Sequence, residues 1–198
     1  MKICIIGANG MVGKKLVKKI LSSDLYQTQI NKICLFDINF NQTKDNLHLT
    51  HIKGNIEDLS QIKKLASERF DIIFHLAAIV SGEAEENFKK GWDVNLFSMW
   101  KLLEALKTEH FKSSKTYIPK LIFTSSIAVF GEPFPEKIDD EFLCSPQTSY
   151  GAQKASAELL ISDFSRKGFI NGMSLRLPTL CVRPGLPNKA ASGFFSNI

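Results

Sequence analysis

Short stretches of consecutive apolar residues alternate along this chain with longer amphipathic segments, and this alternation constrains the fold more than any other feature. The apolar stretches have the length of strands, and their lack of polar alternation is typical of strands buried on both faces. They cover residues 2–6, 32–37, 47–52, 71–76, 120–124 and 173–177. The amphipathic segments predict helices, which begin near residue 12 and cover 59–66, 83–109 and 148–166. Since parallel strands need crossovers of this length, we expect an α/β fold with a doubly wound parallel sheet and helices on both faces.

The composition agrees with a globular domain and excludes several other classes of protein. Of the 198 residues, 44% are hydrophobic and 23% are charged, which are ordinary values for a globular chain and exclude disordered, collagen-like and coiled-coil proteins. No apolar stretch approaches the ~18 residues that span a bilayer, and the apolar run at 3–6 is too short for a signal-peptide core. We therefore expect a cytoplasmic protein that does not associate with membranes.

The charge and the cysteines argue against nucleic-acid and metal binding. The net charge of +5 arises in the first 70 residues, where 11 Lys and Arg accompany 6 Asp and Glu. Four of these lysines lie between Lys14 and Lys19, where a helix places them on one solvated face without an arginine cluster or interleaved aromatic residues. The four cysteines do not have the spacing of a metal or redox motif. We therefore expect no nucleic-acid partner and no metal.

A glycine-rich segment with the sequence Gly7-Ala8-Asn9-Gly10-Met11-Val12-Gly13 follows the first predicted strand and precedes the first predicted helix. In this context Gly7 allows the chain to turn, Gly10 allows backbone N–H groups to approach a pyrophosphate, and Gly13 allows the helix to pack on the strand. The positive end of the helix dipole then faces the phosphates. The segment predicts a dinucleotide site, and the alternative is that the glycines serve a tight turn alone.

Asp37 ends the second predicted strand, 24 residues after Gly13. An acid near this spacing accepts hydrogen bonds from the adenosine ribose and repels the additional phosphate of NADP. Asp37 therefore favours NAD as the cofactor. The alternative is that Asp37 only begins a surface turn with Asn39.

Tyr150 and Lys154 lie four residues apart near the start of a predicted helix, so both side chains project from one stripe of it. A phenol has a pKa near ~10, and a neighbouring ammonium and a cationic nicotinamide lower it. Ser126, at the end of the fifth predicted strand, can donate a hydrogen bond to a substrate oxygen. The three residues support hydride transfer between a carbinol carbon and a nicotinamide, with Tyr150 moving the proton.

Together these segments resemble the extended short-chain dehydrogenase/reductases, the NAD-dependent epimerase/dehydratase family, whose members have a Rossmann fold. The resemblance is carried by the glycine loop at 7–13, His-Leu-Ala-Ala at 75–78, Ser-Ser-x-Ala-Val-aromatic-Gly at 125–131 and Tyr-x-x-x-Lys at 150–154. More narrowly, the segments 80–85, 123–131, 146–151, 176–179 and 182–185 are similar to those of a family member that oxidises a four-carbon sugar acid to its 2-oxo acid.

The resemblance implies a role for many individual residues. Ser126 and Tyr150 would contact the reacting hydroxyl, Lys154 would hold the nicotinamide ribose, and Asn95 would order a water that feeds the proton relay. The implied cofactor contacts are Asn9, Gly10, Met11, Val12, Asp37, Asn55, Ile56, the backbone of Leu76, Ala77 and Ala78, and Pro178. Asn55 stands where family members often have an aspartate, but its amide oxygen can still accept from the adenine amino group.

A 2-hydroxy acid needs a cation for its carboxylate, and Arg183, beyond the sixth predicted strand, is the candidate. Ser81, near the nicotinamide end of the site, is a second candidate substrate contact. The alternative for Arg183 is an ion pair with an acid on the surface.

Residues 1–178 are expected to form the NAD-binding domain with the catalytic residues, and 179–198 to begin a substrate-binding region that the family continues further. We expect this 198-residue chain to bind NAD, to turn over an aldonate much more slowly than a chain with the full substrate-binding region, and to expose apolar surface around 190–195. The alternative is a short form whose own loops, such as 131–146, close the site. The predicted helix at 94–106 is apolar around most of its circumference, which predicts a homodimer. The resemblance implies that this helix and the one with Tyr150 form the interface. The alternative is burial under other parts of the same chain.

Two other functions stay open. A nucleotide-sugar epimerase shares this scaffold, whereas a dehydratase or decarboxylase would place an acid directly after Ser126, where Ile127 stands. An NAD-binding fragment without activity is the other alternative. His75 has no partner at metal-ligand spacing, so we interpret it as a structural histidine.

Overall fold

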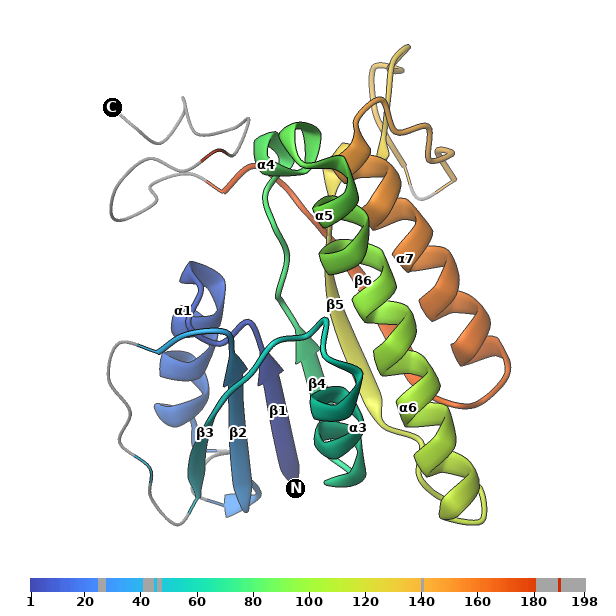
Figure 1. Cartoon of the computed structure of the whole chain (residues 1–198). Helices are drawn as coiled ribbons and strands as arrows, with labels where there is room; N and C mark the ends of the chain where they lie inside the picture. The colour runs from blue at the N-terminus through green and yellow to red at the C-terminus, as the bar shows by residue number, and fades with distance from the viewer. Residues whose placement is uncertain (25–27, 41–44, 46–47, 140, 181–188, 190–198) are drawn as a thin grey trace.

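The computed structural model describes residues 1–24, 28–40, 45, 48–139, 141–180 and 189. Within these residues, six parallel strands form one sheet in the order β3-β2-β1-β4-β5-β6 (Figure 1). The strands are β1 (Lys2–Ile6), β2 (Lys32–Asp37), β3 (Leu49–Lys53), β4 (Ile72–His75), β5 (Lys120–Ser126) and β6 (Asn171–Leu177). The strand order reverses between β1 and β4, and ligands of doubly wound sheets bind at the carboxyl ends of the strands at such a point. The predicted Rossmann-type sheet is confirmed.

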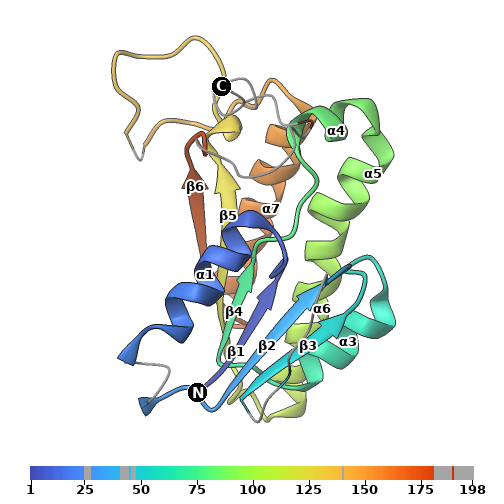
Figure 2. The ribbon, with the colours of Figure 1, turned by 90° about the vertical axis from the view of Figure 1, so that its left-hand side faces the viewer.

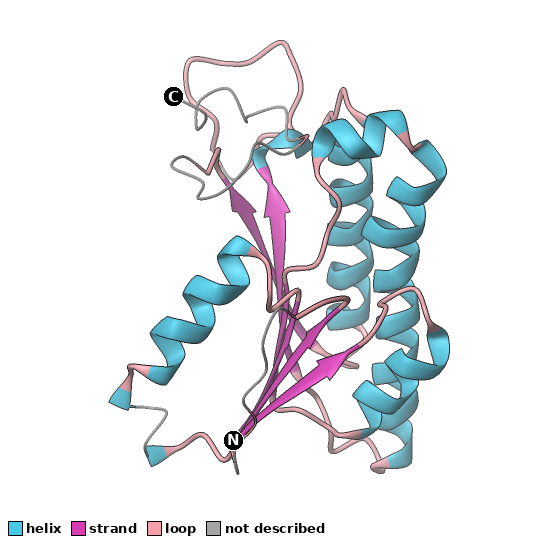
Figure 3. Ribbon diagram, turned by 60° about the vertical axis from the view of Figure 1, so that its left-hand side comes forward, coloured by secondary structure: helices cyan, strands magenta, loops and turns pink. Residues whose placement is uncertain are grey.

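Helices cover both faces of this sheet. Helix α1 lies over one face, and α3, α6 and α7 lie over the other, as Figure 2 and Figure 3 show from two directions. The helices are α1 (Met11–Leu21), α3 (Leu59–Ser67), α4 (Ser81–Glu86), α5 (Phe88–Trp92), α6 (Ser98–Lys112) and α7 (Ser149–Arg166), with a π-helical turn η1 (Asp93–Phe97) and a 3-10 turn η2 (Ile127–Val129). This three-layer arrangement explains why the strands are apolar on both faces.

The core is divided between the two faces of the sheet. On β1, Cys4 and Ile6 belong to the larger cluster, which includes side chains of α3, α6 and α7. Ile3 and Ile5 belong to the smaller cluster, which packs against α1. Because side chains alternate along a strand, each face of β1 contributes to a different cluster.

The segment predicted as one helix over 83–109 is four consecutive elements, so that prediction is wrong in its continuity. The chain breaks at Asn87, which has φ −120° and ψ 69°, and it then passes through the π-helical turn before α6 begins. A π-helical turn inserts one residue into a helix, and such turns are frequent at functional sites. Here the turn contains Asn95, whose side chain bonds to the backbone of Ile79.

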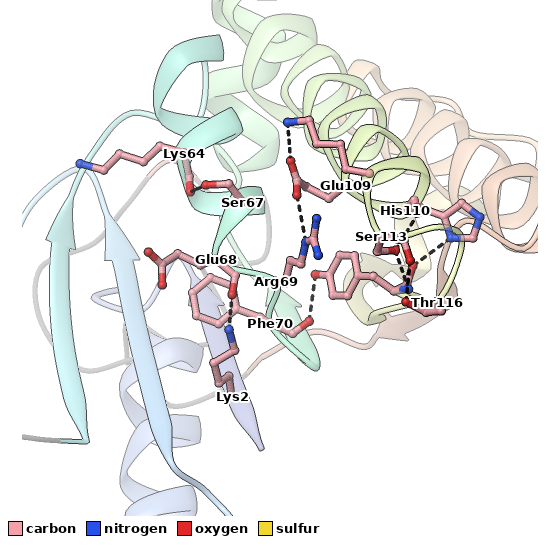
Figure 4. A network of polar contacts seen from close by, with 12 residues as sticks. Lys2, Lys64, Ser67, Glu68, Arg69, Phe70, Glu109, His110, Ser113 and Thr116 are labelled. Atoms are coloured by element: carbon pink, nitrogen blue, oxygen red, sulfur yellow. Dashed lines mark hydrogen bonds and ion pairs between the residues drawn. The ribbon is translucent and has the colours of Figure 1, made fainter.

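The amino ends of β4 and β5, opposite the carboxyl edge of the sheet, are held by a polar network (Figure 4). Glu109 is buried, with 5% of the residue exposed, and its carboxylate accepts hydrogen bonds from Arg69 at 3.0 Å and Lys112 at 2.8 Å. The bond from Lys112, followed by that from Arg69, holds the pKa of Glu109 below its usual value. The Tyr117 hydroxyl donates to the carbonyl of Phe70 at 2.9 Å. This network anchors α6 to the connection between α3 and β4.

The edge strand β6 presents two different faces. Gly172 lies against Ile161 and Ser165 of α7, whereas Met173 and Leu175, on the opposite face, are 54% and 41% exposed. In the described part of the chain, no helix is long and apolar enough to cross a membrane.

Candidate nucleotide-binding and catalytic site

The glycine-rich loop packs against the carboxyl end of β4. Gly7 has φ +85°, and a Cβ there would lie 2.6 Å from the backbone nitrogen of Ala77. A Cβ on Gly13 would lie 2.3 Å from the carbonyl oxygen of Gly7. Only residues without side chains permit these contacts, so the loop lies directly beside the segment that follows β4.

A cavity of about 490 Å³ lies beside this loop, between the carboxyl ends of β1, β2, β3 and β4. Nine of the predicted cofactor residues line it: Gly7, Asn9, Gly10, Asp37, Asn55, Ile56, Leu76, Ala77 and Ala78. Ile6, Phe36, Ile38, Ile79 and Val94 add apolar walls. Backbone N–H groups beside an apolar slot with an acid at one end fit the adenosine and diphosphate part of a dinucleotide.

Asp37 connects the loop to the end of β2. Its Oδ2 accepts a hydrogen bond from the backbone nitrogen of Asn9 at 2.8 Å, and its Oδ1 accepts from the backbone nitrogen of Asn39 at 3.3 Å. The carboxylate therefore makes the turn that was considered as an alternative and also lines the cavity. Asn55 is held by Gln61, whose Oε1 accepts from the Asn55 backbone nitrogen at 2.8 Å.

Two charged residues line the same cavity, and the sequence analysis missed them. Lys90 of α5 donates to Oε1 of Glu83 of α4 at 2.6 Å, and this bond raises the pKa of Lys90. Among the described residues that line the cavity, Lys90 is the one cation, whereas Asp37, Glu57 and Glu83 are acids. No sequence motif marks this pair.

Tyr150, Lys154 and Ser126 come together where α7 meets the end of β5. Helix α7 begins at the hydroxyl of Thr148, which accepts from the backbone nitrogen of Gly151 at 3.0 Å. A Cβ on Gly151 would lie 2.1 Å from the carbonyl oxygen of Ala128, so the first turn of α7 presses on the 3-10 turn that Ser126 caps. The Lys154 ammonium lies 5.6 Å from the centroid of the Tyr150 ring.

The Lys154 side chain is almost completely buried, with 1% of its surface exposed. Its ammonium donates to the carbonyl oxygen of Thr124 at 2.9 Å and lies 4.5 Å from the centroid of the Phe123 ring. Burial lowers the pKa of Lys154 to about 7, and the Glu158 carboxylate opposes part of this shift. A lysine that titrates near neutral pH is suited to a proton-transfer site.

His75 is also fully buried, and neither of its ring nitrogens has a hydrogen-bond partner among the described residues. Burial and then the charge of Lys154 lower the pKa of His75 to about 3. Its ring packs against Phe123 with centroids 5.8 Å apart. These surroundings fit the structural interpretation of this histidine.

Asn95 is buried and bonded to protein atoms. Its Oδ1 accepts from the backbone nitrogen of Ile79 at 2.9 Å, and its Nδ2 donates to the carbonyl of Ile79 at 3.3 Å and to Oε1 of Gln153 at 2.7 Å. The role of ordering a water stays a prediction.

Several predicted residues do not line the cavity. Ser126, Tyr150 and Lys154 lie at the neighbouring ends of β5 and α7, and Ser81 is the first residue of α4. Met11, Val12 and Gly13 form the first turn of α1, and Pro178 is exposed after β6. Arg183, the segment 182–185 and the predicted apolar surface at 190–195 lie outside the described residues. The described residues contain no cluster of three metal-ligand side chains.

A profile of the NAD dependent epimerase/dehydratase family matches residues 3–197. The chain belongs to this family. Two curated members are D-erythronate dehydrogenases, from Haemophilus influenzae with 40% identity over 199 residues and from Cupriavidus necator with 38% identity over 203 residues. All of this chain aligns with each of them, and it spans 61% of their length.

Solved structures similar to this chain have the same architecture. A nucleoside-diphosphate-sugar epimerase from Agrobacterium tumefaciens superposes with a TM-score of 0.90 and 47% identity, over 100% of this chain and 58% of that chain. A monomeric L-threonine 3-dehydrogenase from a metagenome superposes with a TM-score of 0.78 and 27% identity, over 97% and 58%. The chain thus corresponds to the first three-fifths of these relatives in its fold.

Proposed function

We propose that the protein oxidises a secondary hydroxyl of a small sugar acid with NAD, and that D-erythronate is the first substrate to test. The observation that carries this proposal is the buried ammonium of Lys154 beside the Tyr150 ring, next to the turn that Ser126 caps. The identity to two D-erythronate dehydrogenases supports the choice of substrate.

The residues around the cavity fit NAD. Gly7 and Gly13 leave no room for side chains, and the loop presents the start of α1, whose first turn contains no acid, to a diphosphate. Asp37 would accept hydrogen bonds from the adenosine ribose, and Asn55 would face the adenine. When bound, NAD supplies the hydride acceptor.

Tyr150 and Lys154 are the residues that would transfer the proton of the substrate hydroxyl. We propose that the phenolate form of Tyr150 takes the proton of the substrate hydroxyl and becomes the phenol, while Ser126 donates a hydrogen bond to the same substrate oxygen. Lys154, when protonated, stabilises the phenolate of Tyr150 through its charge. Ser81 and Arg183 are proposed to contact the substrate carboxylate.

A nucleotide-sugar epimerase is the second candidate, because the Agrobacterium tumefaciens structure with that title is 47% identical. An NAD-binding chain without activity is the third candidate, because the curated relatives are longer.

The partner we propose is a second copy of the chain. Phe97 of η1, Trp100 of α6 and Leu159 of α7 are 49%, 45% and 73% exposed, which fits a helical dimer face.

The test is to incubate the protein with NAD and a panel of aldonates and nucleotide sugars and to follow the absorbance of the reduced cofactor. Reduction with D-erythronate, and its loss in Tyr150→Phe, is the expected result. Interconversion of a nucleotide sugar without net reduction would favour the epimerase. NAD binding without turnover in this chain, but with turnover in one extended to the length of its relatives, would locate the missing groups beyond residue 198.

Light scattering at high concentration tests the proposed dimer, and a monomer would contradict it.

A further inference from the structure

Gln153 lies between Tyr150 and Lys154 on helix α7 and is completely buried. Its Oε1 accepts a hydrogen bond from Nδ2 of Asn95 at 2.7 Å, across 58 residues of sequence. The contact joins the helix that carries the proposed proton-transfer residues to the π-helical turn on the facing helix.

The other side-chain bonds of Asn95 go to Ile79, which lines the nucleotide cavity. A carboxamide nitrogen has two hydrogens. One bonds the carbonyl of Ile79, and the other bonds Gln153. If the Asn95 carboxamide were rotated by half a turn, its NH2 would face the N–H of Ile79 and its oxygen would face the oxygen of Gln153. The Ile79 N–H and the Gln153 oxygen therefore favour the same rotamer of Asn95, and Gln153 strengthens the preference for the rotamer that holds the Ile79 peptide.

The absence of a side chain at Gly91 makes space for the Gln153 carboxamide, but one of the two polar atoms of that carboxamide has no hydrogen bond among the described residues. A Cβ on Gly91 would lie 2.5 Å from Nε2 of Gln153, and the three nearest atoms all belong to that carboxamide. Nε2 itself is buried without a hydrogen-bond partner among the described residues. A buried unsatisfied donor destabilises a fold, so an apolar side chain of the same length would serve packing alone better.

We propose that Gln153 is a positioning residue, which acts through Asn95 to fix the Ile79 wall of the nucleotide cavity relative to Tyr150 and Lys154. Its effect on turnover rests on the proposed function, whereas its effect on the cavity wall does not.

The first test is Gln153→Met, which keeps the length of the side chain and removes its hydrogen bond. We expect the dissociation constant for NAD to rise by about fivefold and kcat to fall by about tenfold, with little change in KM for the aldonate, because a misplaced wall affects the alignment of bound groups. Amide hydrogen exchange at Ile79 should become faster, and the melting temperature should not fall. Gln147→Met, on the loop before α7, is the matched control and should change none of these quantities.

The second test leaves Gln153 unmutated but shifts its side chain. Gly91→Ala favours the helix, but the added methyl group pushes on the Gln153 carboxamide. We expect weaker NAD binding and faster exchange at Ile79 without a loss of stability. Unchanged NAD affinity and exchange in both Gln153→Met and Gly91→Ala would overturn the proposal.

A double-mutant cycle separates positioning from packing. In an Asn95→Ala background, Gln153→Met should have no further effect on NAD affinity. If the two effects simply add, Gln153 does not act through Asn95 and the proposal is wrong. If the unmodified protein oxidises no aldonate, the proposed function fails, while NAD affinity and exchange at Ile79 still decide the role of Gln153.

Discussion

The backbone nitrogen of Asn9, in the glycine-rich loop, donates a hydrogen bond to Oδ2 of Asp37 at the end of β2, over 2.8 Å. This bond fixes the carboxylate at the side of the cavity and ties the loop to it. A carboxylate accepts up to four hydrogen bonds, so Asp37 keeps acceptor capacity for a ribose.

Asp37→Asn should narrow the preference for NAD over NADP by about tenfold, because it removes the charge that repels the additional phosphate. Calorimetric titration with both cofactors measures the ratio of dissociation constants. Asp163→Asn, near the end of α7 where Asp163 pairs with Arg166, is the control. Tighter binding of NADP than NAD by the unmodified protein would contradict the assignment.

The ion pair of Lys90 and Glu83 predicts opposite effects of two substitutions. Lys90→Met should weaken NAD binding by about threefold, because it removes a positive charge from the cavity, and Glu83→Gln should strengthen binding by a similar factor. Both effects should shrink at high salt. The neighbouring Lys89 pairs with Asp93 and has 89% of its side chain exposed, so Lys89→Met should have no effect. Equal effects of Lys89→Met and Lys90→Met would show a nonspecific charge effect.

The low pKa of Lys154, about 7, predicts a pH dependence of stability. Between pH 7 and the ordinary lysine pKa of ~10.4, the unfolded chain holds a proton that the folded chain has released. The free energy of unfolding therefore rises with pH in this window, and the contribution is lost as the pH falls through 7.

Lys154→Met should remove this dependence and abolish activity. Relative to that variant, the unmodified protein should gain about 2 kcal/mol between pH 7 and pH 9 in urea unfolding. Lys167→Met, at the exposed end of α7, should keep the dependence. A constant difference between the unmodified protein and Lys154→Met at the two pH values would refute the shifted pKa.

Glu109 should matter more for stability than Glu104 on the same helix. Glu109→Gln should lower the free energy of unfolding by about 1.5–3 kcal/mol, because the buried Glu109 carboxylate accepts charge-assisted bonds from Arg69 and Lys112. Glu104 is 40% exposed and pairs with Lys107, so Glu104→Gln should cost under about 1 kcal/mol. Thermal or urea unfolding of both variants measures the difference, and equal losses would argue against this interpretation of the network.

The parts of the site that could be predicted from the sequence depend on local backbone chemistry. The glycine loop and Asp37 follow β1 and β2, whose bounds agree with the prediction at both ends. The break at Asn87 and the π-helical turn could not be predicted, because the turn is associated with a bond between Asn95 and Ile79, which are distant in sequence. Lys90 and Glu83 lie on opposite sides of this break and pair across it.

The family resemblance identified fewer features of the catalytic residues than the structure shows. The resemblance named Tyr150 and Lys154, and the structure adds that Lys154 is almost completely buried. Gln153 gave no signal in the sequence, since one polar residue within a helix does not reveal whether it faces solvent or a buried carboxamide.

The pairing of β1 with β4, with Ile3 beside Ile72, has a consequence for biosynthesis. All described residues that line the nucleotide cavity lie between positions 6 and 94, whereas Ser126, Tyr150 and Lys154 leave the ribosome later. We expect NAD to bind the nascent chain before helix α7 exists, and so to act as a ligand that stabilises the growing sheet. Ribosome-bound chains arrested after α6 has emerged should then resist protease better with NAD than without it, and equal cleavage would show that the cavity forms only after release.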